Sequence, residues 1–356
     1  MHIASYRFYL SALACGAALV LACGSSDESP SSSTDDGGAS TVDGATTADN
    51  EGGATLETDG SSPIDGASGS DGSTPKPWED PLASVRDAGA SAVSLVKNGF
   101  AFTEGPLWRA ASNDLLFNDV VGNATKKLTV PDTVVDFRNP SGLANGMALD
   151  PAKKLVVCEG FGGGRRVSRE NGMGGFDTVL DMWMGKKLNS PNDVIVRSDG
   201  TIYFTDPDYA VVVDKQQTYN GVYRIAPNGT PSLVASDLNL PNGIVLSPDE
   251  KILYVADNGT AKIYKFDVAA DGSTSNKTLF VNVNQPDGIT VNDQGDLFVA
   301  AQTGVEVFKA DGTSLGKLTV PQQPANVAFG GADRKTLFIT ARTALYKAEL
   351  SVSGPP

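Results

Sequence analysis

The sequence predicts an all-β fold, a six-bladed β-propeller, and three observations support this prediction. A carboxylate or amide residue stands immediately before a short apolar strand six times along the chain. The steps between these positions are 41, 47, 50, 45 and 39 residues, which is the repeat length of a propeller blade. Long helical periodicity is absent, whereas strand-sized apolar runs alternate with Asp-Gly, Asn-Gly and Pro-Asp turns. The six positions are Glu104, Asn145, Asn192, Asn242, Asp287 and Asn326.

Each repeat contains enough residues for four short strands. The repeat that begins at Asn242 reads NGIVLSPDEKILYVADNG, then AKIYKFDVAADG and TLFVNV. The final repeat, NVAFGGADRKTLFITARTALYKAEL, provides only three strands. We therefore expect the N-terminal segment SAVSLVKNG, residues 91–99, to supply the fourth strand of the last blade and to close the ring without an exposed sheet edge.

The first residues have the pattern of a bacterial lipoprotein-type signal peptide, expected over residues 1–23. Arg7 precedes an apolar run of 14 residues, 8–21, which is short for a membrane span. The run ends in VLAC, so Cys23 is the expected lipidation site, with simple secretion as the alternative. Acyl chains would anchor the protein to a membrane without spanning it. We expect a protein of the bacterial cell envelope, lipid-anchored in the outer membrane or facing the periplasm, or else a secreted one.

Composition separates a linker from the folded part. Residues 24–80 are expected to form a disordered linker, because residues 24–74 are almost entirely Ser, Gly, Asp, Thr and Ala and cannot bury a core. This stretch holds eleven acidic residues and no Lys or Arg, which accounts for most of the formal net charge of −14. The propeller is expected over residues 81–350, followed by a C-terminal tail, 351–356. Its charge gives no reason to expect a nucleic-acid partner, and we expect a monomer.

Cysteine and histidine usage excludes several kinds of catalytic site. The only histidine is His2, which lies in the expected signal peptide, and Cys158 is the only cysteine outside that region. The expected mature protein therefore has no Ser-His-Asp triad, no histidine zinc site and no internal disulfide. Cys158 lies in the apolar run LVVCEG and is expected to be a buried apolar side chain. Carboxylates, amides, Arg, Lys, Tyr or a metal must supply any chemistry.

The six recurring polar residues are expected to meet at the central channel, because the first strand of each blade lines that channel. Turn chemistry alone explains an Asn or Asp before Gly, and we favour that explanation for Asn145 and Asn326. Glu104 has no turn preference, and a buried carboxylate needs a partner or a cation. Asp287 has the same need. Oxygen ligands suit a hard divalent cation, with Ca²⁺ as the first choice and Mg²⁺, Mn²⁺ or Zn²⁺ as alternatives.

The folded region resembles the SMP-30/gluconolactonase family of six-bladed propellers, in particular its bacterial gluconolactonase-like branch. The stretches that carry this resemblance include FTEGPLW, PSGLANGMALD, GKKLNSPNDVIVRSDGTIYFTDPDY, PNGIVLSPDEKILYVAD and PDGITV. The resemblance implies metal-dependent hydrolysis of a small-molecule sugar lactone. It also implies metal ligands, which fall on Glu104, Asn192, Asn242 and Asp287.

Further roles are expected for residues near these ligands. With no histidine present, Asp287 is the first choice for the carboxylate that deprotonates the attacking water, and Asp193 is the second. The metal would polarise the lactone carbonyl. The expected substrate contacts are Asn145, Arg165, Arg166, Asn192 and Tyr209.

Two departures from the family pattern bear on the substrate. The family has a histidine after the Cys-Glu pair, whereas this chain has Gly160 and Phe161. Asp208 stands where a proline is more usual. Two other functions stay open: a non-catalytic propeller that binds a ligand or partner around a structural metal, and hydrolysis of another ester or phosphoester.

Overall fold

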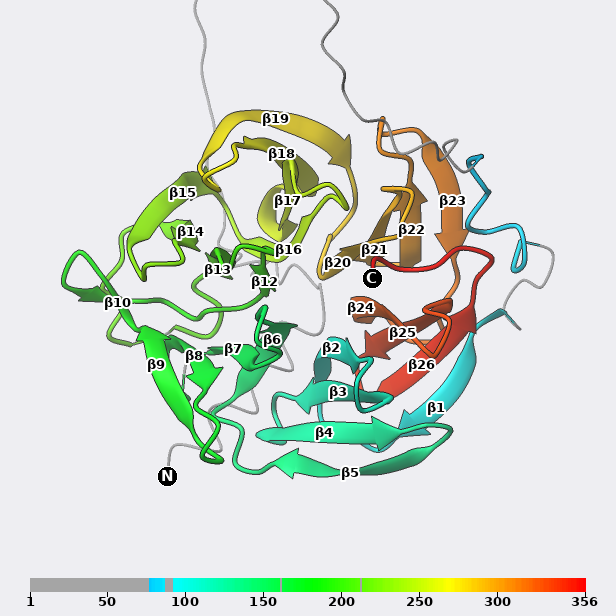
Figure 1. The fold of residues 1–356 in the computed structure, drawn as a ribbon, viewed down its shortest axis with the longest axis horizontal. Coiled ribbons are helices and arrows are strands. Elements are labelled where there is room, and N and C mark those ends of the chain that lie inside the picture. Colours follow the sequence, from blue (N-terminus) through cyan, green and yellow to red (C-terminus); the bar gives the residue numbers. More distant parts are fainter. Residues whose placement is uncertain (1–76, 87–91, 161, 212) are drawn as a thin grey trace, which may run out of the picture. The chain divides into compact units, whose positions relative to one another are not determined.

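The computed structural model describes residues 77–86, 92–160, 162–211 and 213–356, and it contains six four-stranded antiparallel sheets. The sheets are arranged as blades around a centre, with the first strand of each blade innermost (Figure 1). The predicted all-β, six-bladed propeller is confirmed. A short additional hairpin, β10 (Met182–Trp183) and β11 (Lys186–Lys187), connects the second blade to the third.

Five blades are built from four consecutive strands, which follow one another from the centre outwards. Blade 1 contains β2 (Thr103–Arg109), β3 (Asp114–Asp119), β4 (Ala124–Thr129) and β5 (Thr133–Arg138). Blade 2 contains β6 (Ala144–Leu149), β7 (Leu155–Glu159), β8 (Arg166–Glu170) and β9 (Phe176–Leu180). Blade 3 contains β12 (Val194–Val196), β13 (Ile202–Asp206), β14 (Asn220–Ile225) and β15 (Pro231–Leu238). Blade 4 contains β16 (Pro241–Leu246), β17 (Ile252–Asp257), β18 (Lys262–Val268) and β19 (Thr274–Asn282). Blade 5 contains β20 (Ile289–Val291), β21 (Leu297–Ala301), β22 (Gly304–Phe308) and β23 (Ser314–Leu318).

The sixth blade is closed by a strand from the other end of the domain, as the sequence predicts. Its inner strands are β24 (Pro324–Gly330), β25 (Thr336–Ala341) and β26 (Ala344–Glu349). The outermost strand is β1 (Ser94–Asn98), which pairs antiparallel with β26. The edge of β26 is thus hydrogen-bonded to the segment that precedes blade 1, and the ring is complete.

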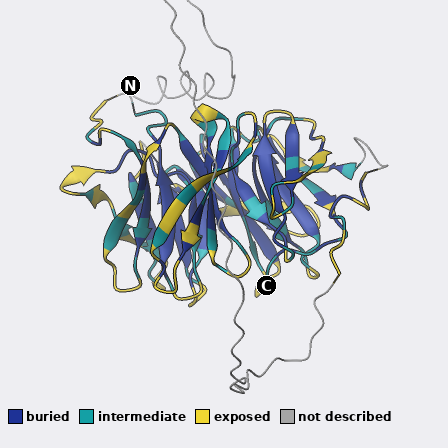
Figure 2. Ribbon diagram, turned by 90° about the horizontal axis from the view of Figure 1, so that it is seen from above, coloured by how far each residue is buried: buried dark blue, intermediate teal, exposed yellow. Residues whose placement is uncertain are grey.

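Burial follows the position of each strand within its blade. Every residue of β3, β7, β13, β21 and β25 is buried, because these second strands lie between neighbouring blades. The outer strands β5, β9 and β19 contain only exposed and partly buried residues. Figure 2 shows buried strands inside the propeller and exposed residues on its outside. Large side chains join neighbouring blades: the ring of Trp108 stacks on Phe338 with centroids 5.7 Å apart, across the junction of blades 1 and 6. Such pairs contribute beyond the area that they bury.

Both flanks of the propeller make specific contacts. Trp78 donates a hydrogen bond from Nε1 to Asp296 at 3.3 Å, and the Lys309 ammonium lies 3.8 Å from the centre of the Trp78 ring. Ordered contacts therefore begin shortly before residue 81, the boundary drawn from the sequence. The tail after β26 also packs closely, since Val352 is fully buried and Gly354 donates its N–H to the Arg334 carbonyl at 2.9 Å.

The expected signal peptide, the lipidation site Cys23 and nearly all of the expected linker lie outside the described residues. Phe161 lies outside them as well. Within the described ranges, no helix is long and apolar enough to cross a membrane.

Candidate functional site

The six recurring polar residues lie at the same end of the six innermost strands. Four of them belong to those strands and two shortly precede one, and the strands surround the centre of the propeller (Figure 1). Glu104, Asn192, Asn242 and Asn326 are buried, while Asn145 and Asp287 are partly buried. We call this set of six the channel ring. The structure therefore brings together all four residues expected to bind the metal.

Close backbone contacts between neighbouring blades fix the channel ring. The N–H of Gly146 donates to the carbonyl of Asn192 at 2.7 Å, and the N–H of Gly243 donates to the carbonyl of Asp287 at 3.2 Å. Gly105 has a φ of +49°, and a Cβ at this position would lie 1.9 Å from the carbonyl oxygen of Asn145. Glycine thus follows four of the six ring residues because the next blade leaves no room for a side chain.

Burial disfavours the ionised forms of the acidic side chains in this site. Burial raises the pKa of Glu104 well above its usual value, and the charge of Asp287 raises it further. Burial also raises the pKa of Asp287, and the charge of Asp193 adds to the effect. The pKa of Asp193 is raised to about 7, again by burial. A divalent cation placed among these carboxylates would offset both the lost hydration and the mutual repulsion.

The donor set of the channel ring fits such a cation. Glu104 and Asp287 supply carboxylates, and Asn192 and Asn242 supply amide oxygens, which are ligands that hard divalent cations accept. The Oδ1 atom of Asn145 is buried without a hydrogen-bond partner, so the ring also contains an unused oxygen. In the part of the chain that the structure describes, no group of three or more His, Cys, Asp or Glu side chains is placed to hold a metal. The ring differs from such a group because amides supply half of its expected ligands.

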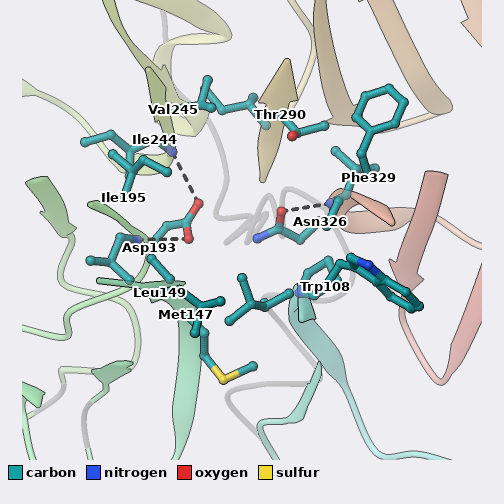
Figure 3. A pocket seen from close by; sticks show the side chains of 18 of the residues that line it. Trp108, Met147, Leu149, Asp193, Ile195, Ile244, Val245, Thr290, Asn326 and Phe329 are labelled. Atoms are coloured by element: carbon teal, nitrogen blue, oxygen red, sulfur yellow. Dashed lines mark hydrogen bonds between the residues drawn. The ribbon is translucent and has the colours of Figure 1, made fainter. Parts of the chain in front are cut away.

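Asp193 and Tyr209 both lie close to the channel ring, in different ways. The Asp193 carboxylate accepts the N–H of Val194 at 2.9 Å and that of Ile244 at 3.2 Å, and it points into the channel (Figure 3). Tyr209 lies on the connection between β13 and β14, and its hydroxyl accepts a hydrogen bond from the Asn242 amide at 3.2 Å. Burial raises the pKa of Tyr209, and so does the charge of Asp287, so the phenol keeps its proton.

The two arginines expected to contact substrate are engaged elsewhere. Arg165 donates from Nε to the Leu188 carbonyl at 2.8 Å and from Nη1 to the Asp214 carbonyl at 3.1 Å. Arg166 donates from Nε to the buried carboxylate of Glu159 at 2.8 Å. The Arg165 contacts join blade 2 to the segments at Leu188 and Asp214, and the Arg166 contact joins the neighbouring strands β7 and β8. Neither guanidinium contacts a channel-ring side chain through them.

Of the residues at which the chain departs from the family pattern, Gly160 and Asp208 lie within the described residues, and Asp208 directly precedes Tyr209 in the chain. A side chain at Gly160 would begin 3.0 Å from the Ser190 hydroxyl, two residues before Asn192. A side chain at this position would therefore be tightly packed against the segment that leads to Asn192. Asp208 forms an ion pair with Lys215 at 2.6 Å and accepts a hydrogen bond from Asn220 at 3.2 Å, so it braces the connection that carries Tyr209.

The sequence does not identify Arg342 as a residue of the site, and it explains Asn326 by turn chemistry. In the structure, however, Asn326 is buried, its Oδ1 accepts the N–H of Val327 at 2.8 Å, and its Nδ2 points into the channel (Figure 3). Arg342, in the turn between β25 and β26, lies near enough for its charge to lower the pKa of Asp287. The repeat spacing identifies the position of Asn326, whereas nothing in the local sequence distinguishes Arg342.

A cavity of about 300 Å³ continues along the channel from the floor of the site. Asp193 and Asn326 lie at its end nearest the ring, and its walls are side chains and backbone of the innermost strands (Figure 3). Pro355 and Pro356 of the tail also line the cavity. The tail therefore lies towards the end of the channel opposite the ring.

Comparisons with known proteins agree with this geometry. Residues 102–343 match the model of the SMP-30/Gluconolactonase/LRE-like region. A gluconolactonase of Zymomonas mobilis is 33% identical over 287 residues, covering 70% of this chain and 78% of the relative. A pentonolactonase of Haloferax volcanii is 31% identical over 251 residues, covering 67% of this chain and 80% of the relative.

A solved structure from Xanthomonas campestris, described as a gluconolactonase important in glucose secondary metabolic pathways, superimposes with a TM-score of 0.68. It shares 33% sequence identity with this chain, and the match covers 72% of this chain and 89% of that one. Since the family match alone extends over more than half of the chain, the protein belongs to the SMP-30/gluconolactonase/LRE-like family.

Proposed function

We propose that this protein hydrolyses a sugar lactone in a reaction that depends on a divalent cation at the channel ring, with Ca²⁺ as the first choice. The observation that carries the proposal is the convergence of buried Glu104 and partly buried Asp287, two carboxylates with raised pKa values, beside amide side chains at one end of the channel. The lactonases among its relatives support the substrate class.

Glu104, Asn192, Asn242 and Asp287 would hold the cation. When bound, the cation supplies Lewis-acid polarisation of the lactone carbonyl. Asn145 would bind a substrate hydroxyl, because its Oδ1 is a buried acceptor without a protein partner. Tyr209 keeps its proton and so offers a hydroxyl that can donate within the same site.

Asp287 is the better placed of the two candidate bases. Both oxygens of Asp193 accept backbone N–H groups, which fixes this side chain at the floor of the site. Asp287 would accept a proton from the attacking water as the water oxygen bonds to the carbonyl carbon. The bond between that carbon and the ring oxygen then breaks, and the departing oxygen takes this proton back from Asp287 to give the open hydroxy acid and the ionised carboxylate.

The test is an assay of the purified protein against D-glucono-1,5-lactone and a panel of sugar lactones. EDTA-treated protein is compared with protein given Ca²⁺, Mg²⁺, Mn²⁺ or Zn²⁺. We expect turnover of at least one lactone that EDTA abolishes and one of these ions restores. Tight metal binding without turnover of any lactone would contradict the proposal and favour a binding protein with a structural metal. Aryl esters and phosphotriesters in the same assay test the remaining hydrolase activities.

A further inference from the structure

Two hydroxyl groups that follow one another along blade 3 hold Asn242, the ring residue of blade 4. The Thr205 hydroxyl on β13 donates to the backbone carbonyl of Asn242 at 2.7 Å. The Tyr209 hydroxyl, on the connection after β13, accepts a hydrogen bond from the side-chain Nδ2 of Asn242 at 3.2 Å. Thr205 and Asn242 are buried, and Tyr209 is partly buried. Blade 3 therefore fixes both the main chain and the side chain of this ring residue.

The bond to Tyr209 distinguishes the two ends of the Asn242 amide. An amide NH₂ group only donates hydrogen bonds, whereas the amide oxygen is the end that binds a hard cation. In the structure the hydroxyl bonds the nitrogen end, so Oδ1 is the end that remains for a cation. An amide turned the other way would direct its oxygen to Tyr209 and its NH₂ group to the cation, which an NH₂ group cannot bind.

Asp208 fastens the connection that carries Tyr209 to the segment that carries Asn242. Its carboxylate accepts a hydrogen bond from the side-chain Nδ2 of Asn220, the first residue of β14, at 3.2 Å. The same Nδ2 donates to the backbone carbonyl of Asn239 at 2.5 Å, shortly before β16 begins. Contacts on either side therefore hold the Tyr209 hydroxyl and the Asn242 amide next to each other before any cation binds.

We propose that Tyr209 is a positioning residue of the channel ring: its hydroxyl holds the Asn242 amide with the oxygen available to a divalent cation. This inference rests on the proposed function, in which Asn242 is a metal ligand. A cation at Oδ1 leaves a buried NH₂ group that needs an acceptor, and the Tyr209 hydroxyl supplies one. Residues that orient metal ligands through hydrogen bonds typically account for about 10–100-fold in metal affinity. A single neutral hydrogen bond belongs at the lower end of this range.

The experiment measures Ca²⁺ affinity by isothermal titration calorimetry, with no substrate present, so that a role of Tyr209 in contacting substrate does not contribute. Tyr209→Phe keeps the aromatic ring and removes only the hydroxyl. Tyr203→Phe is the matched control, because Tyr203 is a fully buried tyrosine of β13 whose hydroxyl donates to the Gly272 carbonyl at 2.6 Å and not to the channel ring. Melting temperatures in EDTA report any general loss of stability in either variant.

We expect Tyr209→Phe to weaken Ca²⁺ binding about tenfold, and Tyr203→Phe to leave it within about twofold of the wild type. Equal affinities of Tyr209→Phe and the wild type would overturn the inference, as would an equal loss in both variants.

A second pair of variants tests whether the hydroxyl acts through the orientation of the amide. Asn242→Asp places an oxygen at both ends of the side chain, so no orientation needs to be held. In this background we expect Tyr209→Phe to change Ca²⁺ affinity by less than about twofold. A loss as large as that in the wild-type background would mean that the hydroxyl does not act by orienting Asn242, and it would overturn the inference.

The outcome is separable from that of the proposed function. If no lactone is turned over but Tyr209→Phe still loses Ca²⁺ affinity selectively, the lactonase proposal is wrong and the positioning role stands. If lactones are hydrolysed with full metal dependence while Tyr209→Phe binds Ca²⁺ normally, the positioning role is wrong and the lactonase proposal stands. Wild-type protein that binds none of Ca²⁺, Mg²⁺, Mn²⁺ and Zn²⁺ would overturn both.

Discussion

At the scale of single residues, the site is a small group of buried acids surrounded by amides. Burial raises the pKa of Glu104, Asp287 and Asp193, the charges of Asp287 and Asp193 raise that of Glu104 further, and the charge of Asp193 raises that of Asp287. Such an arrangement costs stability in a protein without metal, because carboxylates lose hydration and repel one another. The same arrangement favours cation binding, since the cation relieves both costs. The same carboxylates therefore lower the stability of the metal-free protein and favour cation binding.

Replacing Glu104 with glutamine tests whether the cation is catalytic or structural. The neutral amide removes a proposed ligand and one of the repelling charges. We expect lactone turnover to fall at least about 100-fold, while the melting temperature in EDTA stays equal to that of the wild type or rises. Steady-state kinetics and thermal melts measure the two quantities. A variant that keeps wild-type turnover and loses only thermal stability would indicate a structural ion.

The stability of the metal-free protein is expected to fall as pH rises. The pKa of Asp193 is about 7 in the folded state, above its value of about 3.9 in an unfolded chain. The folded state therefore binds more protons between these values, and stability decreases as pH rises towards 7. Between pH 5 and pH 8 we expect a loss of about 1–3 kcal/mol in EDTA.

Urea denaturation at several pH values measures this loss. Saturating Ca²⁺ should reduce the slope, because the cation competes with protons for the same carboxylates. Asp193→Asn should also flatten the pH dependence in EDTA. An Asp193→Asn protein with the same pH profile as the wild type would assign the effect to other groups.

At the scale of structural elements, the innermost strands provide the residues of the candidate site, and the second strands stabilise the fold by packing between neighbouring blades. The second strands are buried along almost their whole length, and their aromatic side chains join adjacent blades. The innermost strands provide the channel ring at one end and the cavity wall along their length. The two roles occupy different strands, so each can be altered separately.

A substitution at Phe338 tests the structural role of the second strands. Phe338 is buried on β25 and stacks on Trp108 of blade 1. Phe338→Ala should destabilise the protein by about 3–5 kcal/mol, because a large cavity would form at the junction of two blades. Phe137→Ala is the control, since Phe137 lies on the outer strand β5 and is exposed. Equal losses of unfolding free energy in the two variants would contradict this division of roles.

The sequence predicts the blades and most of the ring because both repeat. Glu104 and Asp287 stand at equivalent places in different blades, so their meeting at the channel follows from the fold alone. The contacts of Arg165 could not be predicted in this way. They depend on how the loop before β8, which holds Arg165, packs against the segment before β12, which holds Leu188. The close packing of Asn326 against Gly288 could not be predicted for another reason: its motif is visible, but the contact exists only once blades 5 and 6 are side by side.

At the scale of the whole propeller, the segments that flank the blades complete the structure. The tail is fixed to blade 5 by a hydrogen bond from the Asp293 N–H to the Ser353 carbonyl at 2.8 Å. It is fixed to blade 6 by the Arg334 guanidinium, which donates to the Gly354 carbonyl at 2.9 Å. It therefore connects two blades at the end of the channel away from the ring, in addition to lining the cavity there.

The fit of the tail predicts the effect of Gly354→Ala. The added Cβ would lie 2.3 Å from Phe329 Cβ. We expect a destabilisation of about 1–3 kcal/mol, because the tail or Phe329 must shift to make room. Ca²⁺ affinity should be unchanged, since the channel ring lies at the opposite end of the innermost strands. Chemical denaturation and calorimetry test the two parts, and a large loss of Ca²⁺ affinity would show that the two ends are coupled.

The closing strand β1 has a consequence for how the protein is made. Ser94 and its partner Lys347 are 253 positions apart in the chain. At a synthesis rate of about 5–20 residues per second, β1 leaves the ribosome about 10–50 s before β26 is available to pair with it. During that interval β1 has no partner strand, while the six blades follow it in the chain. The nascent chain therefore depends on keeping this one segment from pairing with another protein until its last blade arrives.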